Sequence, residues 1–328
     1  MTVNEAPLIS VIVPAYNAEK WIGECCQSVF RQSYPNVELI AVDDGSTDST
    51  LAELTRLCGS RDDMRVIHTE NGGVCRARNV GLDNARGGLI TFLDADDMLF
   101  DNALEVLYSL LSQTDADISI GWKRNISADG KELGSPYRRE KAVYDGLDGL
   151  KRSLEDNPAM HSVWGKLYKK SAIGQLRFVE GRRVHEDSFF VFECMLGQPR
   201  VAVGEEDVLY YRISENSASR SGFSEKHFDM IYFADRKRAL IEERYPELMP
   251  LCENAIVKAN MALLWNLILT DDPKYRTVEK NAIQNVLDRK KYYKTALGSD
   301  AKLFWLITHG LYRPYKALHA LKRTIIQG

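Results

Sequence analysis

Short apolar, β-branched runs alternate with stretches of helical periodicity through the first third of the chain. The runs predict buried strands at Leu8–Pro14, Val37–Asp43, Met64–Thr69, Gly88–Leu93 and Asp117–Gly121. The stretches between them predict helices at Glu19–Phe30, Ser49–Cys58, Val74–Ala85 and Asn102–Leu111. Thr50 and Glu53 have the spacing of a capping box at one helix start. This alternation predicts an α/β fold with a mostly parallel sheet and helices on both of its faces.

The pattern changes twice further along the chain. Residues 122–225 are less regular, and we expect them to complete one domain, 1–225, in which 1–121 bind one substrate and 122–225 the second. Residues 226–328 predict a helical region, with helices at Lys226–Arg244, Leu251–Leu269 and Val278–Leu287. Its last stretch, Leu303–Ile326, is apolar, aromatic and basic.

Composition narrows the class of protein. The 328 residues are 45% hydrophobic and 27% charged with a net charge of -3, which is typical of a globular protein and does not suggest nucleic-acid binding. The six cysteines include no C-x-x-C pair, so we expect reduced thiols and a cytoplasmic location. We find no secretory signal and no run of apolar residues long enough to span a membrane.

Polar, turn-forming residues follow each of the first four predicted strands. These segments are Pro14–Asn17, Asp43–Ser46, Glu70–Gly73 and Asp94–Asp97. Ligands of open parallel sheets bind beyond the carboxyl ends of the strands. We therefore expect at least three of these segments to contact one shared ligand.

The segment Asp94-Ala95-Asp96-Asp97 carries the densest charge. If the strand continues through it, Asp94 and Asp96 point to the same side. Paired carboxylates repel unless a cation lies between them, and their oxygens suit Mg²⁺ or Mn²⁺. Such an ion would stabilise a departing diphosphate. The alternative is an acidic turn whose last aspartate caps the next helix.

Asp43-Asp44-Gly45-Ser46 follows the second strand. An aspartate there can accept hydrogen bonds from a base or a ribose, and Gly45 permits a tight turn. Asp48 or Ser49 is expected to cap the following helix. The alternative is an ordinary turn between a strand and a helix.

Arg76 and Arg78 lie in the first turns of the helix that follows Asn71-Gly72-Gly73. A helix N-terminus favours anions, and arginine adds bidentate phosphate recognition. The two arginines do not share a helix face, so we expect at most one to reach a ligand. The alternative places both on a solvated face.

His185-Glu186-Asp187 is the candidate acid–base site. Two adjacent carboxylates before the apolar run Phe189–Val191 are costly to bury, which indicates either partners or a function. The alternative is a helix N-terminus, where acidic residues are favoured in any protein. Phosphate loops, dinucleotide-binding glycine motifs and hydrolase nucleophile elbows are absent, which disfavours those enzyme classes.

Four motifs together resemble the family 2 glycosyltransferases with the GT-A fold. They are LISVIVPAYN at 8–17, VDDGSTDS at 42–49, NGGVCRARNVG at 71–81 and FLDADD at 92–97. The resemblance covers about residues 7–215. It implies a GT-A catalytic domain at 1–225, with its nucleotide-sugar-binding part at 1–121 and its acceptor-binding part at 122–225.

The resemblance also implies roles for residues at matching positions. The implied donor site is Pro14, Ala15, Tyr16, Asn17, Asp43, Asp44, Gly45, Arg78, Asp94 and Asp96, with Asp96 and Asp94 as ligands of Mn²⁺ or Mg²⁺. The implied catalytic pair is Asp187, as base, with Glu186. The implied acceptor side is Trp164, Lys166 and His185, where Trp-Gly-Lys replaces a frequent Trp-Asn-Lys.

The activity implied by this resemblance is inverting, metal-dependent sugar transfer. The donor would be a nucleotide sugar, most often a UDP-sugar, and the acceptor a glycan or lipid-linked saccharide of polysaccharide biosynthesis. Such enzymes work at the cytoplasmic membrane face, where Trp305, Tyr312 and Tyr315 of the basic tail would meet lipid headgroups. Alternatively, the tail packs as helices on the catalytic domain. The rival functions are a sugar-nucleotidyltransferase and an inactive sugar- or partner-binding module.

Overall fold

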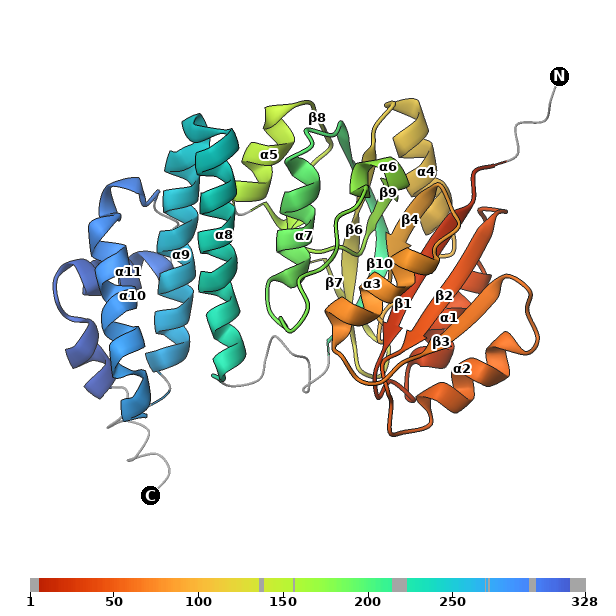
Figure 1. Ribbon diagram of the computed structural model, residues 1–328, viewed down its shortest axis with the longest axis horizontal. Coiled ribbons are helices and arrows are strands. Elements are labelled where there is room, and N and C mark those ends of the chain that lie inside the picture. The colour runs from red at the N-terminus through yellow and green to blue at the C-terminus, as the bar shows by residue number, and fades with distance from the viewer. Residues whose placement is uncertain are drawn as a thin grey trace. The chain divides into compact units, whose positions relative to one another are not determined.

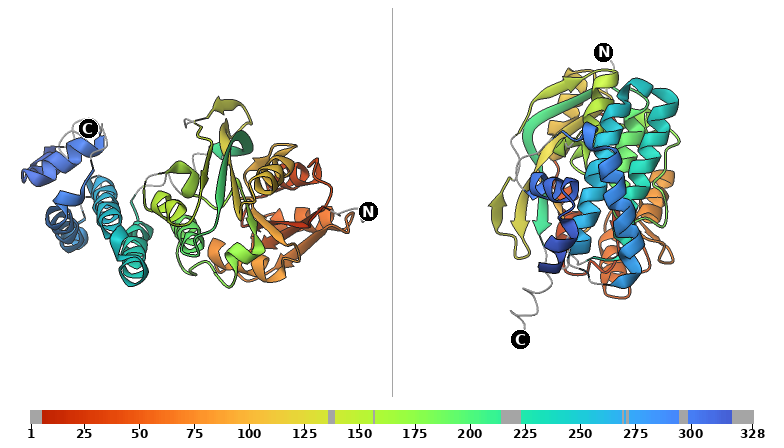
Figure 2. Two further views of the ribbon diagram at one scale, coloured as in Figure 1. Left: turned by 90° about the horizontal axis from the view of Figure 1, so that it is seen from above. Right: turned by 90° about the vertical axis from the view of Figure 1, so that its left-hand side faces the viewer.

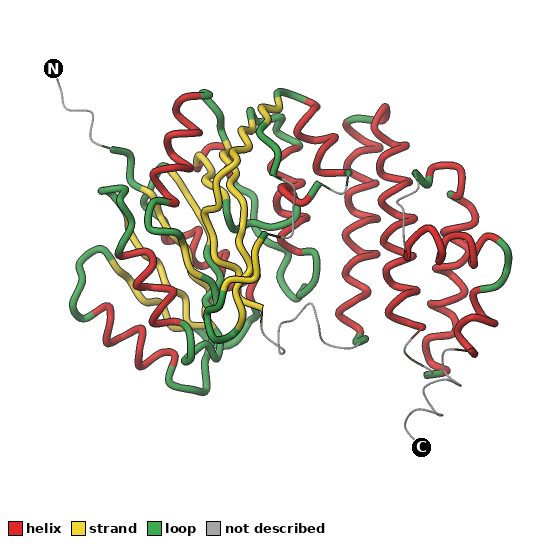
Figure 3. The backbone as a smooth tube through the Cα atoms, turned by 180° about the vertical axis from the view of Figure 1, so that it is seen from behind, coloured by secondary structure: helices red, strands yellow, loops and turns green. Residues whose placement is uncertain are grey.

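The computed structural model describes residues 6–135, 139–155, 157–213, 223–268, 270, 272–294 and 299–318. The chain divides into two compact units, Met1–Ser217 and Ala218–Gly328 (Figure 1). The first unit contains a ten-stranded sheet, and the described residues of the second form helices and short connections (Figure 3). The sequence pattern predicts the end of the first unit at residue 225, whereas in the structure it ends at Ser217.

The first half of the sheet is parallel. Its strands are β1 (Ile9–Ala15), β2 (Val37–Asp43), β3 (Met64–His68) and β4 (Leu89–Phe92), in the order β3-β2-β1-β4. The connecting helices are α1 (Ile22–Phe30), α2 (Thr50–Cys58) and α3 (Val74–Asn84). The predicted elements are confirmed here, with ends that differ by a few residues. All four strands therefore present their carboxyl ends at one edge.

The second half of the sheet is mixed. Strand β9 (Lys166–Lys169) runs antiparallel between β4 and β6 (Ile118–Ser127), while β10 (Val201–Ile213) is parallel to β6 and antiparallel to β5 (Met98–Leu99). The remaining elements of this half are β7 (Glu132–Gly134), β8 (Ala142–Tyr144), α4 (Ala103–Gln113), α5 (Leu147–Leu154), α6 (Lys170–Ile173) and α7 (Glu186–Met195). The longest ladders of the sheet are parallel, as predicted, and the antiparallel pairs of the second half are short. Strands as short as β5 and β9 cannot show a period of two in the sequence.

Helices cover both faces of the sheet (Figures 1 and 2). Alternate residues of β1, among them Ile9, Val11 and Val13, are fully buried in a cluster with apolar residues of α1, α2 and α4. On the other face α3 packs against β1 and β2, and a Cβ at Gly81 would overlap the side chain of Ile12. A glycine there lets the helix lie close to the strand. All six cysteines are free, as the sequence predicts.

The capping-box prediction at the start of α2 is wrong. Ser49 is the N-cap, without a side-chain capping bond. Asp48 Oδ1 instead accepts from Thr50 N at 2.9 Å, and the Thr50 hydroxyl accepts from Ala18 N at 2.8 Å. Glu53 pairs with Arg56 on the exposed face of the helix, so it does not reach back to the N-cap. The Thr50 hydroxyl therefore joins the start of α2 to the loop after β1.

The main helices among the described residues of the second unit lie in residues 229–308. They are α8 (Asp229–Arg244), α9 (Met249–Ile268), α10 (Arg276–Asp288) and α11 (Ser299–Thr308), and α9 packs against the other three. Helices α8 and α9 lie side by side in Figures 1 and 2. The three predicted helices of this region are confirmed, although Leu269 lies outside the described residues. Within the described part of the chain, no helix combines the length and the apolar character needed to cross a membrane.

Candidate functional site

The loops after β1 and β2 are joined by hydrogen bonds. Asp44 N donates to Ala15 O at 2.8 Å, and Asn17 N donates to Ser46 Oγ at 3.0 Å. Between them, Tyr16 leaves 51% of its surface exposed. An exposed aromatic ring on a fixed loop is suited to stacking on a planar ligand.

Asp44 extends this connection to the loop after β3. Its two carboxylate oxygens accept from Gly72 N and Gly73 N, each at 2.8 Å. Gly45 has φ +70°, and a Cβ there would lie 2.7 Å from Asn71 N. The sequence analysis expected Asp44 to contact a ligand, and the structure adds a role in shaping the loops. Each oxygen keeps a further lone pair for that contact.

Asp43 is fully buried at the end of β2. Its Oδ2 lies 2.7 Å from His68 Nδ1 and accepts from Ser46 N at 3.4 Å. Its Oδ1 is buried without a hydrogen-bond partner among the described residues. Buried acceptors are rarely left unpaired, and those that are need an explanation such as a water or a ligand.

The four residues after β4 form a turn and do not continue the strand. Strand β4 ends at Phe92, and Asp97 N donates to Asp94 O at 3.0 Å. The strand alternation predicted for Asp94 and Asp96 is therefore wrong, although the two carboxylates still interact. Burial, and then the charge of Asp94, raise the pKa of Asp96 to about 6. Burial, and then the charges of Asp96 and Asp94, raise the pKa of Asp97 well above its ordinary value.

The alternative that the last aspartate of the turn caps a helix is also wrong. Strand β5 follows the turn, and the N-cap of α4 is Asn102. Asp97 is buried, and its Oδ1 accepts from Arg212 N in β10 at 2.8 Å. The acidic turn, Asp94–Asp97, is therefore anchored from the far side of the sheet.

Arg212 is a buried residue of the site that no sequence motif indicates. Its side chain is 3% exposed, and it donates through Nε to Asp96 O at 2.9 Å, through Nη1 to Ala128 O at 2.9 Å and through Nη2 to Glu24 Oε2 at 2.8 Å. The segment Tyr210-Tyr211-Arg212 shows no pattern that predicts this network. Its partners are spread from α1 to the β6–β7 connection, so only the tertiary fold brings them together.

Arg78 joins the acidic turn to the candidate acid–base residues. It is buried on α3, and its guanidinium donates to Asp94 Oδ1 at 2.9 Å and to Glu186 Oε1 at 3.2 Å. Arg76 is half-buried and Arg78 is buried, so the two arginines of this helix differ in their environment. A buried guanidinium is tolerated when carboxylates pair with it, and this one has two.

Glu186 and Asp187 occupy the first turn of α7, after His185 in a left-handed conformation with φ 66°. The helix N-terminus considered as the alternative is thus real, but it does not account for the electrostatics of the pair. Although Asp187 keeps some contact with solvent, burial, and then the charge of Glu186, raise the pKa of Asp187 to about 7. A carboxylate with this pKa can take up a proton near neutral pH.

Lys166 lies close to Asp187 in a buried position. It is 1% exposed and its Nζ donates to Ser162 O at 2.5 Å. Burial lowers the pKa of Lys166 to about 7, while Asp187 acts to raise it. Trp164 is half-buried, with its ring 5.5 Å from that of Tyr211. Of the three residues expected on the acceptor side, only His185 is exposed.

The acidic turn suits a divalent cation that receives further ligands from a substrate. Among the described residues, no group of three or more His, Cys, Asp or Glu side chains is arranged to hold a metal ion. Mg²⁺ is commonly bound through one or two carboxylates and substrate phosphates, and the desolvated Asp96 carboxylate beside Asp94 matches that need. Asp94 and Asp96 therefore fit the expected ion as a partial ligand set.

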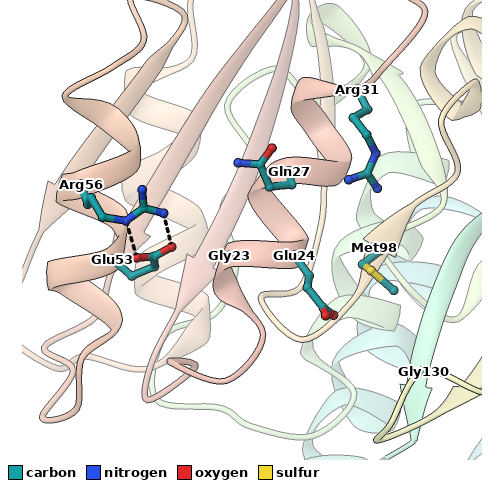
Figure 4. A pocket seen from close by; sticks show the side chains of 8 residues that line it. All are labelled: Gly23, Glu24, Gln27, Arg31, Glu53, Arg56, Met98 and Gly130. Atoms are coloured by element: carbon teal, nitrogen blue, oxygen red, sulfur yellow. Dashed lines mark hydrogen bonds and ion pairs between the residues drawn. The ribbon is translucent and has the colours of Figure 1, made fainter.

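A separate groove of about 500 Å³ lies on the first unit (Figure 4). Its lining comes mainly from α1 and α2 and includes the ion pair of Glu53 with Arg56. It contains none of the predicted site residues. It adjoins the site at Glu24, which pairs with Arg212, and at Met98, which follows the acidic turn in the chain.

The chain is similar to known proteins both in sequence and in structure. The profile described as Glycosyl transferase family 2 matches residues 10–177. The chain is 34% identical over 222 residues to glycosyltransferase GlyA of Streptococcus pneumoniae serotype 4, covering 65% of this chain and 31% of GlyA. It is 33% identical over 217 residues to GlyG of the same organism, covering 63% of this chain and 71% of GlyG.

Solved structures of S. aureus TarS 1-349 are similar to nearly the whole chain. The complex of TarS with UDP-GlcNAc has a TM-score of 0.69 at 19% identity and covers 96% of this chain and 91% of TarS. The complex with UDP has the same TM-score at 21% identity. At these identities the likeness concerns the fold, a central sheet with surrounding helices and a helical C-terminal region.

Proposed function

Because this chain belongs to glycosyl transferase family 2, we propose that it transfers a sugar from a UDP-sugar, with inversion, to a glycan or lipid-linked saccharide of polysaccharide synthesis. The observation that carries the proposal is the pairing of Arg78 with both Asp94 and Glu186. It connects Asp94, one of the two proposed cation ligands, with Glu186, the neighbour of the candidate base. The UDP and UDP-GlcNAc complexes of TarS support a uridine nucleotide as the donor carrier.

The donor would lie across the strand-end loops. Tyr16, Asn17 and Asp44 would contact the nucleoside, with Pro14, Ala15, Asp43 and Gly45 shaping the same pocket. Asp94 and Asp96 would hold Mn²⁺ or Mg²⁺, which when bound offsets the charge of the departing diphosphate. Arg78 contributes positive charge on the same side and keeps the Asp94 carboxylate in place.

Asp187 would act as the base of a single displacement. It accepts the proton of the acceptor hydroxyl while that oxygen forms a bond to the anomeric carbon of the donor. The bond from this carbon to the diphosphate oxygen breaks, and the nucleoside diphosphate leaves with the electron pair. The raised pKa of Asp187, about 7, supports this role, because the carboxylate can both ionise and accept a proton near neutral pH.

Donor turnover in the Asp187→Asn variant tests the proposal. UDP release from a panel of UDP-sugars, with Mn²⁺ and without an acceptor, is measured alongside the rise in melting temperature that UDP causes. We expect slow UDP release by the wild type and a loss of about 10²-fold or more in the variant. The rise in melting temperature with UDP should remain.

Asp148→Asn, at an exposed aspartate on α5, is the matched control and should retain turnover. A pyrophosphate product would instead identify a sugar-nucleotidyltransferase. Binding of UDP without turnover of any UDP-sugar would favour an inactive binding module. Loss of UDP binding in Asp187→Asn would remove the role assigned to that carboxylate.

The helical unit is proposed to contact membrane lipids near a lipid-linked acceptor. Exposed apolar side chains that support this are Trp305, Leu311 and Leu318, and the basic Lys302 and Arg313 are exposed beside them in the sequence. Tyr312 cannot take part as expected, because it is buried and its hydroxyl donates to Leu264 O of α9 at 3.1 Å. Lys322 and Arg323 lie outside the described residues.

A further inference from the structure

A small cavity lies in the second half of the sheet domain, beside the candidate base. Its lining residues are Gly121, Trp122, Lys123, Pro158, Ala159, Ser162, Trp164 and Lys166. Its volume is about 10 Å³, which is room for roughly one water-sized group. Trp122, Ala159, Ser162 and Lys166 are buried, whereas Lys123, Pro158 and Trp164 are half-buried. The cavity therefore extends from a partly exposed rim to a buried end.

The ionisable side chains that line this cavity are all basic. Two of the eight lining residues are lysines and none is acidic. The Lys166 ammonium donates to the carbonyl of Ser162, and Lys166 forms no ion pair with a carboxylate of the described residues. A buried ammonium without a carboxylate partner is costly, which is the situation that a bound anion relieves.

The second lysine is held at the rim by aromatic rings. Lys123 Nζ lies 3.6 Å from the ring centroid of Tyr211 and 5.0 Å from that of Trp164. These contacts stabilise the cation at the mouth of the cavity. The rings also shield it from water, which strengthens its attraction for an anion.

Each lysine lies within electrostatic range of one carboxylate of the proposed site. Asp187 acts to raise the pKa of Lys166 against the effect of burial, and Asp97 does the same for Lys123. The cavity therefore lies near both the candidate base and the acidic turn. A group bound here would belong to a molecule whose hydroxyl is presented to Asp187.

We propose that this cavity binds one oxygen of an anionic group, a phosphate or a carboxylate, carried by the acceptor. The inference rests on the proposed glycosyl transfer and adds the chemical class of the acceptor. Lys166 at the buried end and Lys123 at the rim donate to the anion, and Trp164 packs against the apolar part next to it. The donor diphosphate is not the occupant, because its proposed cation ligands lie on the acidic turn.

Fluorine NMR of the full chain labelled with 5-fluorotryptophan tests this proposal. The chain has five tryptophans, of which Trp122 and Trp164 line the cavity and Trp305 lies in the second unit. With the donor site saturated by UDP and Mg²⁺, inorganic phosphate and acetate are titrated separately. We expect the Trp164 signal to shift in a saturable way while that of Trp305 does not.

The comparison uses Lys166→Met and Lys123→Met, with Lys169→Met as the matched control. Lys169 is on the same strand as Lys166 but pairs with Asp117 at 3.1 Å. Loss of one charge-assisted hydrogen bond should weaken anion binding about tenfold or more in the first two variants, and the control should resemble the wild type. The anion that saturates at the lower concentration distinguishes a phosphate-bearing from a carboxylate-bearing acceptor.

Two results would overturn the inference. One is a wild-type protein that binds UDP but shows no saturable shift of Trp164 with either anion. The other is an equal shift in wild type, Lys123→Met and Lys166→Met. Since Lys166→Met can fail to fold, Lys123→Met alone is sufficient for the second comparison. Failure of the wild type to bind UDP would count against the proposed function, and this result is distinguishable from a failure to bind the anions.

Discussion

The buried guanidinium of Arg78 bonds both the acidic turn and the candidate acid–base pair. Burial of the Arg78 guanidinium would destabilise the fold without its two carboxylate partners, Asp94 on the acidic turn and Glu186 on α7. Arg78 pairs with Glu186, whereas no arginine of the described residues forms an ion pair with Asp187. The two neighbouring acids therefore differ in environment, which is how enzymes separate the roles of adjacent carboxylates.

The pH dependence of transfer is the prediction at this scale. The base must be ionised, and the pKa of Asp187 is raised to about 7, so kcat/KM should fall about tenfold per pH unit below that value. Glu186→Gln removes the neighbouring negative charge that helps to raise this pKa. The acidic limb of the profile should then move to lower pH by about one unit.

The measurement is kcat/KM for a UDP-sugar between pH 5 and pH 9 at fixed ionic strength (about 0.1 M). Glu180→Gln, at an exposed glutamate before α7, serves as the control and should leave the limb unchanged. An acidic limb that stays in place in Glu186→Gln would mean that another group is responsible for it.

At the scale of elements, the acidic turn depends on a strand that is distant in sequence. Strand β10 supplies Arg212, whose backbone N–H bonds Asp97 and whose side chain bonds the carbonyl of Asp96. The same guanidinium reaches Ala128 and Glu24. The turn is thereby held in one conformation, with its carboxylates presented where a cation and a diphosphate would meet them.

Replacing Arg212 should disturb both stability and the proposed cation site. Arg212→Met leaves the carbonyls of Asp96 and Ala128 without their donor, at a cost of about 3 kcal/mol in the free energy of unfolding. Urea unfolding measures this loss, and the extra rise in melting temperature that Mn²⁺ adds to that of UDP should shrink. Arg177→Met, which breaks an exposed pair with Asp83, should cost less than about 1 kcal/mol. Equal stabilities of the two variants would contradict the anchoring role.

At the scale of the whole molecule, the two units have different characters. In the first unit, most of the candidate site residues follow the ends of the strands. The described part of the second unit consists of helices that bury apolar side chains of their own. Tyr312 and the pair of Lys316 with Glu279 tie the end of its described chain to α9 and α10. Within the helical unit, α11 contacts α9 and α10.

Vesicle binding is the prediction for this unit. The full chain should sediment with vesicles of phosphatidylglycerol and much less with vesicles of phosphatidylcholine, because basic residues accompany the exposed apolar ones. Trp305→Ser removes a side chain that is 51% exposed and should reduce the bound fraction severalfold. Tyr16→Ser, an equally exposed aromatic in the first unit, is the control. Equal sedimentation with both lipids, or no effect of Trp305→Ser, would contradict lipid contact through this unit.

The sequence by itself determined the parallel half of the sheet, its connecting helices and the four strand-end segments. These features follow from local patterns, because the apolar periodicity and the turn-forming residues that predict them occur within contiguous stretches of the chain. The motifs for Asp94, Asp96 and Asp187 were visible for the same reason. Only the tertiary structure decided that Asp94–Asp97 is a turn, that Arg78 pairs with two acids and that Arg212 and Lys123 enter the site. Those contacts join residues far apart in the chain, and short strands such as β5 and β9 take their pairing from neighbours rather than from their own pattern.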